Sequence, residues 1–324
     1  PLNKCRWRLP KSRFSSNSTY ISKDSRLRQE YLEPDLVYAP EIKKSLIDGG
    51  MDSLLATHFA HLFVRDPLVI FSEDLQEIDL SKTDHFENFQ STNWQHIRFK
   101  PPPASNDIGW RVEFRPIEIQ ITDFENAAFS IFIILLSRAI LSFNLNFYIP
   151  IRKTDDNMQT AHKRNAILEE KFYFRKNLLP TGSKPYLDGL SCYSDIKTDS
   201  SLPELPIEDE YTLMSIDMIM NGSKPESIDN FPGLIPIVEK YLDMMNVDVQ
   251  TRCRLDNYLD LIRKRANGSL WTTAKWIREF VQTHEDYKAD SQVSEKISHH
   301  LIGAVLALEN DQRYQVKNLN SFLP

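Results

Sequence analysis

Glycine is scarce in this chain of 324 residues, which contains only 9 glycines, whereas an average composition is roughly 7% glycine. Neither G-x-G-x-x-G nor G-x-x-x-x-G-K-[ST] occurs in it, so a nucleotide site of the Rossmann or Walker type is excluded. Cysteine is rare too: Cys5, Cys192 and Cys253 are far apart and include no C-x-x-C pair. This pattern predicts free thiols in a reducing compartment rather than a disulfide framework.

An excess of positive charge is also absent. Lysine and arginine number 39 against 45 acidic residues, which gives a net charge of −6 and argues against nucleic acid or an anionic membrane as the main partner. The balance of 41% hydrophobic and 26% charged residues is typical of a soluble globular protein. The chain begins with Pro1 and no signal-peptide pattern follows, so we expect either a processed protein or a piece of a longer one.

A membrane helix needs about 20 apolar residues, and the longest apolar run, residues 126–143, is interrupted by Arg138. We therefore predict a buried core helix there rather than a membrane span. Thr122 and Glu125 match a capping box, which predicts where this helix begins.

Apolar residues at helical spacing predict several further helices. His58 and His61 lie in the first of them, and we interpret both as packed residues rather than metal ligands, because no third ligand follows at a suitable spacing. The predicted helices cover residues 54–64, 158–174, 234–245, 255–267, 274–281 and 297–308.

The order of these patterns predicts an α+β protein that folds as a single unit over residues 1–324. The first part of the chain is polar and irregular. Strands and helices that contain the candidate site residues follow it, and the end of the chain is helical. The expected regions are 1–50 (irregular), 51–178 (site region), 179–210 (loop-rich insertion) and 211–324 (helical).

The clearest strand pattern runs from Trp110 to Ile121, and three charged residues on it share one face. Arg111, Glu113 and Arg115 occupy alternate positions, so their side chains point to the same side. Unpaired charges cannot be buried without a large cost, which leaves two interpretations. The face is either solvated and paired with a neighbouring strand, or it is a site where a carboxylate holds Mg²⁺ and arginines bind phosphate or carboxylate oxygens.

The segment just before this strand adds positive charge beside aromatic and amide side chains. Arg98 and Lys100 follow Asn93, Trp94 and Gln95, a mixture that also occurs where proteins stack single-stranded nucleic acid. The acidic net charge disfavours that alternative. Pro116 accompanies a one-residue shift in the apolar alternation of the strand, which predicts a bulge or bend there.

Several segments resemble the catalytic subunit of eukaryotic glutamate–cysteine ligase, also called γ-glutamylcysteine synthetase. The similarity extends over essentially the whole chain and is weakest in residues 1–50 and 179–210. The segments that carry it are HFENFQSTNWQHIRFKPPP (85–103), GWRVEFRPIEIQITDFEN (109–126), KFYFRK (171–176), HLFVRDPL (61–68), EYTLMSID (210–217) and FPGLIPI (231–237).

The resemblance implies a cytoplasmic enzyme that ligates the γ-carboxylate of L-glutamate to L-cysteine with ATP, as the first step of glutathione biosynthesis. In this family the glutamate forms a γ-glutamyl phosphate, which the cysteine amine then attacks. Mg²⁺ and arginine would neutralise the phosphate charge. A smaller modifier subunit is an expected partner, whereas nucleic acid and membrane are not.

The resemblance also implies residue roles. Glu113 would be a Mg²⁺ ligand, and Arg115 would be the catalytic contact to phosphate or to the transition state. Arg98 would bind nucleotide or glutamate, and Asn93 and Lys100 would be neighbours in the same pocket.

The family fold implied is an antiparallel sheet of the glutamine-synthetase-like type, with a largely helical C-terminal portion. Family members are much longer than this chain, which aligns with their C-terminal half. Other metal-binding glutamates would lie in the absent half, so we expect the isolated chain to be inactive. The alternative is a non-catalytic binding or regulatory protein derived from the ligase, which lacks the complete metal site.

Overall fold

The chain folds into two compact units, Pro1–Ile117 with Tyr148–Gln159 and Glu118–Phe147 with Thr160–Pro324. The sequence led us to expect one unit, but each unit buries apolar clusters of its own. The computed structural model describes residues 15, 18–65, 71–75, 79, 82, 87–89, 91, 97–100, 102, 107–179, 206–223, 231–309 and 321–322.

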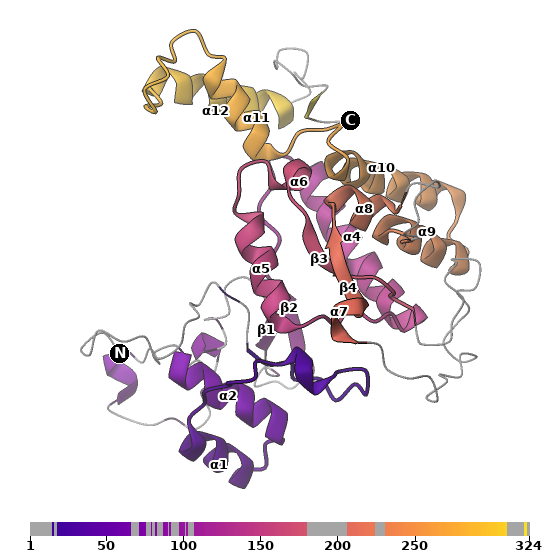
Figure 1. The fold of residues 1–324 in the computed structure, drawn as a ribbon. Helices are drawn as coiled ribbons and strands as arrows, with labels where there is room; N and C mark the ends of the chain where they lie inside the picture. Colours follow the sequence, from indigo (N-terminus) through magenta and orange to yellow (C-terminus); the bar gives the residue numbers. More distant parts are fainter. Residues whose placement is uncertain are drawn as a thin grey trace. The chain divides into compact units, whose positions relative to one another are not determined.

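The described residues of the first unit form short helices and one two-stranded sheet (Figure 1). Residues 40–48 form a helix, so the expectation that residues 1–50 are irregular is wrong there; Pro40 at the first helical position presets the backbone for this helix. Its elements are η2 (Gln29–Tyr31), α1 (Pro40–Asp48), α2 (Ser53–Arg65), η3 (Ser72–Leu75), β1 (Ile97–Lys100), β2 (Arg111–Phe114) and most of α5 (Ile151–Ala161).

Helix α2 supplies the core of the first unit and confirms the helix predicted at residues 54–64. Its Phe59 and Leu62 pack with Phe89. His58 and His61 are buried, as predicted, at 5% and 1% exposure. The Nδ1 atom of His61 lies 2.7 Å from the carbonyl oxygen of Val37, so this buried histidine joins α2 to a segment 24 positions earlier in the chain.

Strands β1 and β2 are antiparallel and pair over four residues each. The strand predicted at residues 110–121 is thus shorter than expected and ends at Phe114. Pro116 explains the early end, because proline has no N–H to donate to a ladder. The sheets that the structure describes are both two-stranded and antiparallel, and a larger glutamine-synthetase-like sheet stays a prediction.

The second unit is largely helical, and its four C-terminal helices confirm the predicted ones. The Asn267–Gly268 end of α10 is also where the sequence placed it. The elements are α4 (Asp123–Phe143), α6 (Ala166–Glu169), β3 (Phe172–Arg175), α7 (Ile207–Glu210), β4 (Tyr211–Met214), α8 (Ile216–Asn221), α9 (Leu234–Met244), α10 (Val249–Ala266), α11 (Thr273–Gln282) and α12 (Glu295–Glu309).

The prediction of one helix over residues 158–174 is wrong. Helix α5 ends at Ala161, Asn165 has a left-handed backbone with φ 56°, and Phe172 begins β3, which pairs with β4. The partner strand lies far along the chain, so the local pattern could not reveal it. Strand β4 also corrects the expectation that residues 211–324 are purely helical. Residues 180–205 of the expected insertion lie outside the described residues.

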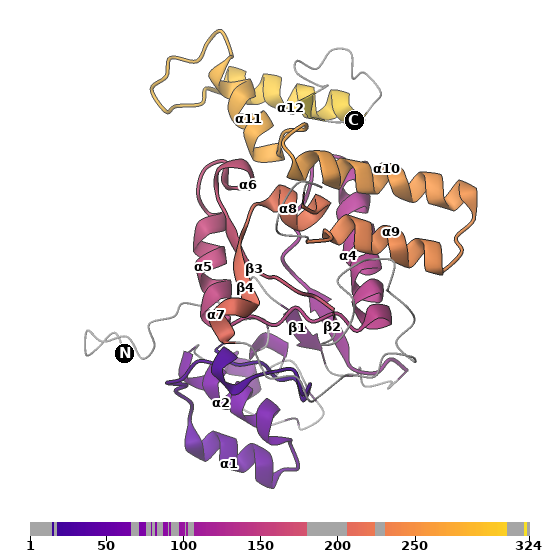
Figure 2. The same ribbon diagram turned by 45° about the vertical axis from the view of Figure 1, so that its right-hand side comes forward.

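Helix α4 packs against α9 and α10, and both of these helices extend across it in the second view (Figures 1 and 2). The capping box predicted at Thr122 and Glu125 is present. The core-helix prediction holds for the face with Phe132 and Phe143, but Leu141 is 72% exposed on another face. Among the described helices, α4 is the one long and apolar enough to cross a membrane by length and composition.

Candidate functional site

Strands β1 and β2 bring the predicted charged residues onto one face of a small sheet. Arg98 lies opposite Glu113, and Lys100 lies opposite Arg111. Because side chains alternate along a strand, these four project to the same side. Arg115, which directly follows β2, contacts the same carboxylate.

Three cations surround the carboxylate of Glu113. The Nη2 atom of Arg98 and the Nζ atom of Lys100 lie 2.7 Å and 2.8 Å from its Oε2 atom. The Nε atom of Arg115 lies 3.2 Å from Oε1. All four side chains are between 19% and 33% exposed. The hydrogen bond from Lys100, followed by the interactions with Arg98, holds the pKa of Glu113 below its usual value.

Ser91 orients two of these arginines, and sequence reasoning missed it. Arg98 donates from Nη1 to the Ser91 hydroxyl at 2.9 Å, and Arg115 donates from Nη1 to the Ser91 carbonyl at 3.0 Å. The hydroxyl itself donates to the carbonyl of Glu87 at 2.8 Å. The one available signal was the position of Ser91 within the family-like segment 85–103, because a lone serine has no periodicity to mark it.

The structure therefore brings together four of the five predicted site residues: Arg98, Lys100, Glu113 and Arg115. Asn93 lies outside the described residues. The pairing of charges across β1 and β2 agrees with the first interpretation of the strand face, and a phosphate or carboxylate site on that face stays a prediction. Arginine forks and a lysine ammonium directed at one point are suited to binding carboxylate or phosphate oxygens.

A magnesium ion does not fit the described residues as they are arranged. Mg²⁺ requires near-octahedral oxygen ligands, but both oxygens of Glu113 already contact cationic groups. Within the described part of the chain, no group of three histidine, cysteine, aspartate or glutamate residues could hold a metal ion. Within the described residues, the carboxylate of Glu113 is thus held by cationic side chains rather than left open to a metal ion.

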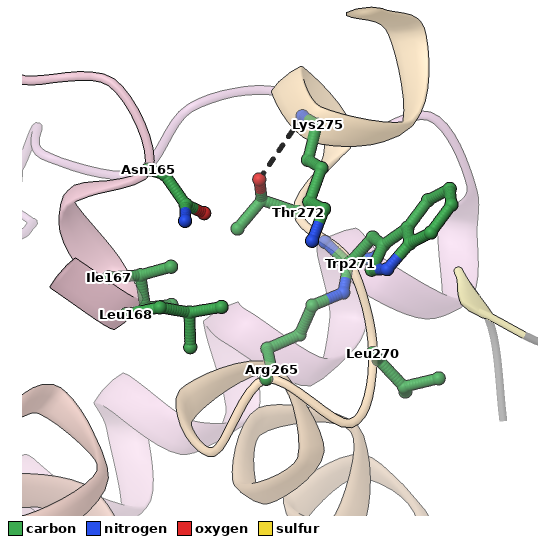
Figure 3. Close-up of a pocket in the computed structure, with 9 residues that line it drawn as sticks. Asn165, Ile167, Leu168, Arg265, Leu270, Trp271, Thr272 and Lys275 are labelled. Carbon is green, nitrogen blue, oxygen red and sulfur yellow. Dashed lines mark hydrogen bonds between the residues drawn. The ribbon is translucent and has the colours of Figure 1, made fainter. Parts of the chain in front are cut away.

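A shallow pocket in the second unit is a weaker candidate. Its cavity volume is about 10 Å³, far below the roughly 300–1,000 Å³ of typical ligand sites. Figure 3 shows Arg265 and Lys275 extending toward each other there, beside Leu168 and Trp271. Arg265 is already paired with a buried carboxylate, and none of the predicted site residues lines this pocket.

The described residues form an α+β protein in which three cations surround one carboxylate on a small antiparallel sheet. A family model described as glutamate-cysteine ligase matches residues 1–308. The glutamate–cysteine ligase of Neurospora crassa is 61% identical over 97% of this chain and 46% of its own length. The glutamate–cysteine ligase catalytic subunits of mouse and human are each 51% identical over 93% of this chain and 45% of their own length.

The chain belongs to the glutamate–cysteine ligase family, which confirms the resemblance inferred from its sequence. It spans less than half the length of these relatives. Its correspondence to the C-terminal half of such a ligase stays a prediction.

Proposed function

We propose that this chain forms part of an ATP-dependent glutamate–cysteine ligase. The reaction would join the γ-carboxylate of L-glutamate to the amine of L-cysteine through a γ-glutamyl phosphate, as the first step of glutathione biosynthesis. Family membership and the names of the fungal and mammalian relatives support the ligation. The ATP dependence rests on the chemistry of the charged face.

The observation that carries the proposal is the group of three cations that converge on one point of the β1–β2 sheet. Phosphoryl transfer depends on positioning and on neutralisation of phosphate charge. In the proposal Arg115 is the catalytic residue that contacts the transferred phosphate, and Arg98 and Lys100 bind ATP or glutamate oxygens. Asn93 keeps its proposed place as a neighbour of this pocket.

Magnesium would accompany ATP by neutralising its phosphates, and the described residues do not supply a metal centre of their own. The residues of the chain itself would act on the anion directly. Ser91 holds the guanidinium groups of Arg98 and Arg115 in fixed orientations, and the partly buried positions of the cations strengthen their attraction for an anion. The contribution of these residues is therefore binding and orientation.

The proposal includes a modifier subunit as a partner, because the mouse and human relatives are named catalytic subunits. It also includes a cytoplasmic location. The isolated chain is expected to bind nucleotide without forming product. A ligase-derived binding or regulatory protein is the second candidate, and the engagement of both Glu113 oxygens by cations favours it.

Calorimetric titration of the purified chain with ATP tests the proposal. The wild type is expected to bind, and Arg98→Gln or Arg115→Gln is expected to weaken binding about tenfold, because each removes a charge-assisted contact. Lys44→Gln removes one positive charge from exposed α1 in the same unit and is expected to change nothing. Equal ATP affinity in all four proteins, or no affinity in any, refutes the assignment of this face.

A second assay addresses the ligation. The chain is incubated with ATP, magnesium, L-glutamate and L-cysteine, and γ-glutamylcysteine is measured by mass spectrometry. We expect no product from residues 1–324 alone. Product formation would refute the expected inactivity and exclude the non-catalytic alternative.

A further inference from the structure

We propose that Glu113 is an internal counterion, which occupies the anion site of the charged face and is displaced by phosphate. This inference rests on the proposed function, because it takes the polyphosphate of ATP as the competing anion. It differs from the role implied by resemblance, in which the same carboxylate is a metal ligand.

The contacts of Glu113 are those of a bound anion. Its Oε2 atom accepts from both Arg98 and Lys100 at 2.7 Å and 2.8 Å, and its Oε1 atom lies 3.2 Å from the Nε atom of Arg115. The cations come from β1 and from the residue after β2, so the carboxylate lies at their common centre. A single exposed ion pair would not have this convergence.

The converging cations need an anion to stay together. Arg98 and Lys100 contact the same oxygen atom, so their like charges are close and would repel each other if the carboxylate left alone. A phosphate group offers more charge than a carboxylate and accepts paired donors from an arginine fork. It can therefore replace Glu113 at the same donors.

Ser91 makes such an exchange possible without loss of the site. It accepts from the Nη1 atoms of Arg98 and Arg115 through its hydroxyl and its carbonyl, and neither contact involves Glu113. The two arginines thus keep these anchors when the carboxylate moves away. The donors released by Glu113 are then available to the incoming anion.

The test is a calorimetric titration of the full chain with inorganic tripolyphosphate, in a chelating buffer without divalent metal. Glu113→Gln is expected to bind about five- to tenfold more tightly than the wild type, because three ion pairs no longer compete with the ligand. Glu41→Gln is the matched control. It removes the same charge from the exposed first turn of α1 in the same unit and is expected to bind like the wild type.

Glu113→Asp keeps the negative charge that offsets the three cations in the folded protein, but its side chain is shorter, so the carboxylate reaches the cations less well. Its affinity is expected to lie between those of the wild type and Glu113→Gln. Circular dichroism of each protein shows whether it is folded, and the aspartate variant decides the question if the glutamine variant does not fold.

Equal or weaker binding by the folded Glu113 variants, with the wild type binding normally, overturns the internal counterion and leaves the proposed function intact. No binding by any variant, including the wild type, overturns the proposed phosphate site as well. Binding by Glu113→Gln alone supports the inference, because the carboxylate then excludes the ligand from the wild type.

Discussion

The buried ion pair between Glu125 and Arg265 should be a main determinant of stability in the second unit. The side chains are 0% and 5% exposed, and their charged atoms lie 2.6 Å apart. Arg265 also donates to the carbonyl of Phe322 at 3.2 Å and lies over its ring. Burial lowers the pKa of Arg265 from its ordinary value, against the raising effect of Glu125. Among the described residues, Glu125 is the carboxylate that compensates the charge of this arginine.

Glu125→Ala removes two stabilising interactions at once. It leaves a buried guanidinium without its counterion, which costs roughly 3–5 kcal/mol. It also removes the acceptor for the N–H and hydroxyl groups of Thr122, and the loss of such a cap costs about 1 kcal/mol. The expected total of roughly 4–6 kcal/mol is a large part of the 5–15 kcal/mol by which domains are stable.

Urea unfolding, followed by tryptophan fluorescence and circular dichroism, measures this loss. Trp276 is 1% exposed and stacks on Phe322 with ring centroids 5.1 Å apart, so its emission reports on the region that Arg265 anchors. The matched control is Glu239→Ala. Its ion pair with Arg263 has the same 2.6 Å distance, but both side chains are about one third exposed, and the expected cost is below about 1 kcal/mol.

The double variant Glu125→Leu with Arg265→Met should recover most of the lost stability, because a buried ion pair can be replaced by apolar side chains at little cost. The reasoning fails if Glu125→Ala costs no more than Glu239→Ala. It also fails if the double variant is less stable than Glu125→Ala.

Three further predictions concern other parts of the chain. Desolvation raises the pKa of Tyr20 from 10.0 to about 12, so the folded protein binds the phenol proton more tightly than the unfolded chain does. The stabilisation from neutral Tyr20 is therefore complete below pH 10 and falls by up to about 2.5 kcal/mol as the pH rises through 12. The difference between the urea midpoints of the wild type and Tyr20→Phe should shrink over that pH range. Gly233→Ala should destabilise the second unit by more than about 2 kcal/mol, because φ is +84° and a Cβ atom would lie 2.4 Å from the backbone nitrogen of Gly222; unchanged thermal unfolding would contradict this. Ser91→Ala should weaken ATP binding several-fold and Ser91→Thr should restore it, because the hydroxyl accepts from Arg98; equal affinities in calorimetry would refute the orienting role.

Local sequence determined those helices and strands whose capping residues or apolar spacing can be recognised within a few neighbouring positions. The capping box at Thr122 and Glu125 placed the start of α4, and apolar spacing located α2 and the four C-terminal helices. Alternation along residues 111–115 placed three charges on one face before any partner strand was known. Long family-like segments then identified the ligase family, which the comparisons confirm.

The candidate site was only partly visible in the sequence, because its contacts join residues that are far apart. Arg98 and Glu113 are 15 positions apart, and only the antiparallel register places them opposite each other. Ser91 reaches Arg115 across 24 positions through a backbone carbonyl, a group that every residue type carries. No residue pattern can mark such a contact.

The sequence by itself determined the helices, the charged strand face and the family, because periodicity, capping and long motifs are properties of neighbouring residues. Tertiary structure alone decided the rest. It replaced the end of the helix predicted at 158–174 with β3 paired to β4, and it divided the chain into two units. It also placed three cations around Glu113. These features depend on which distant segments pair and bury one another, and that choice is made by the free energy of the whole fold rather than by any local pattern.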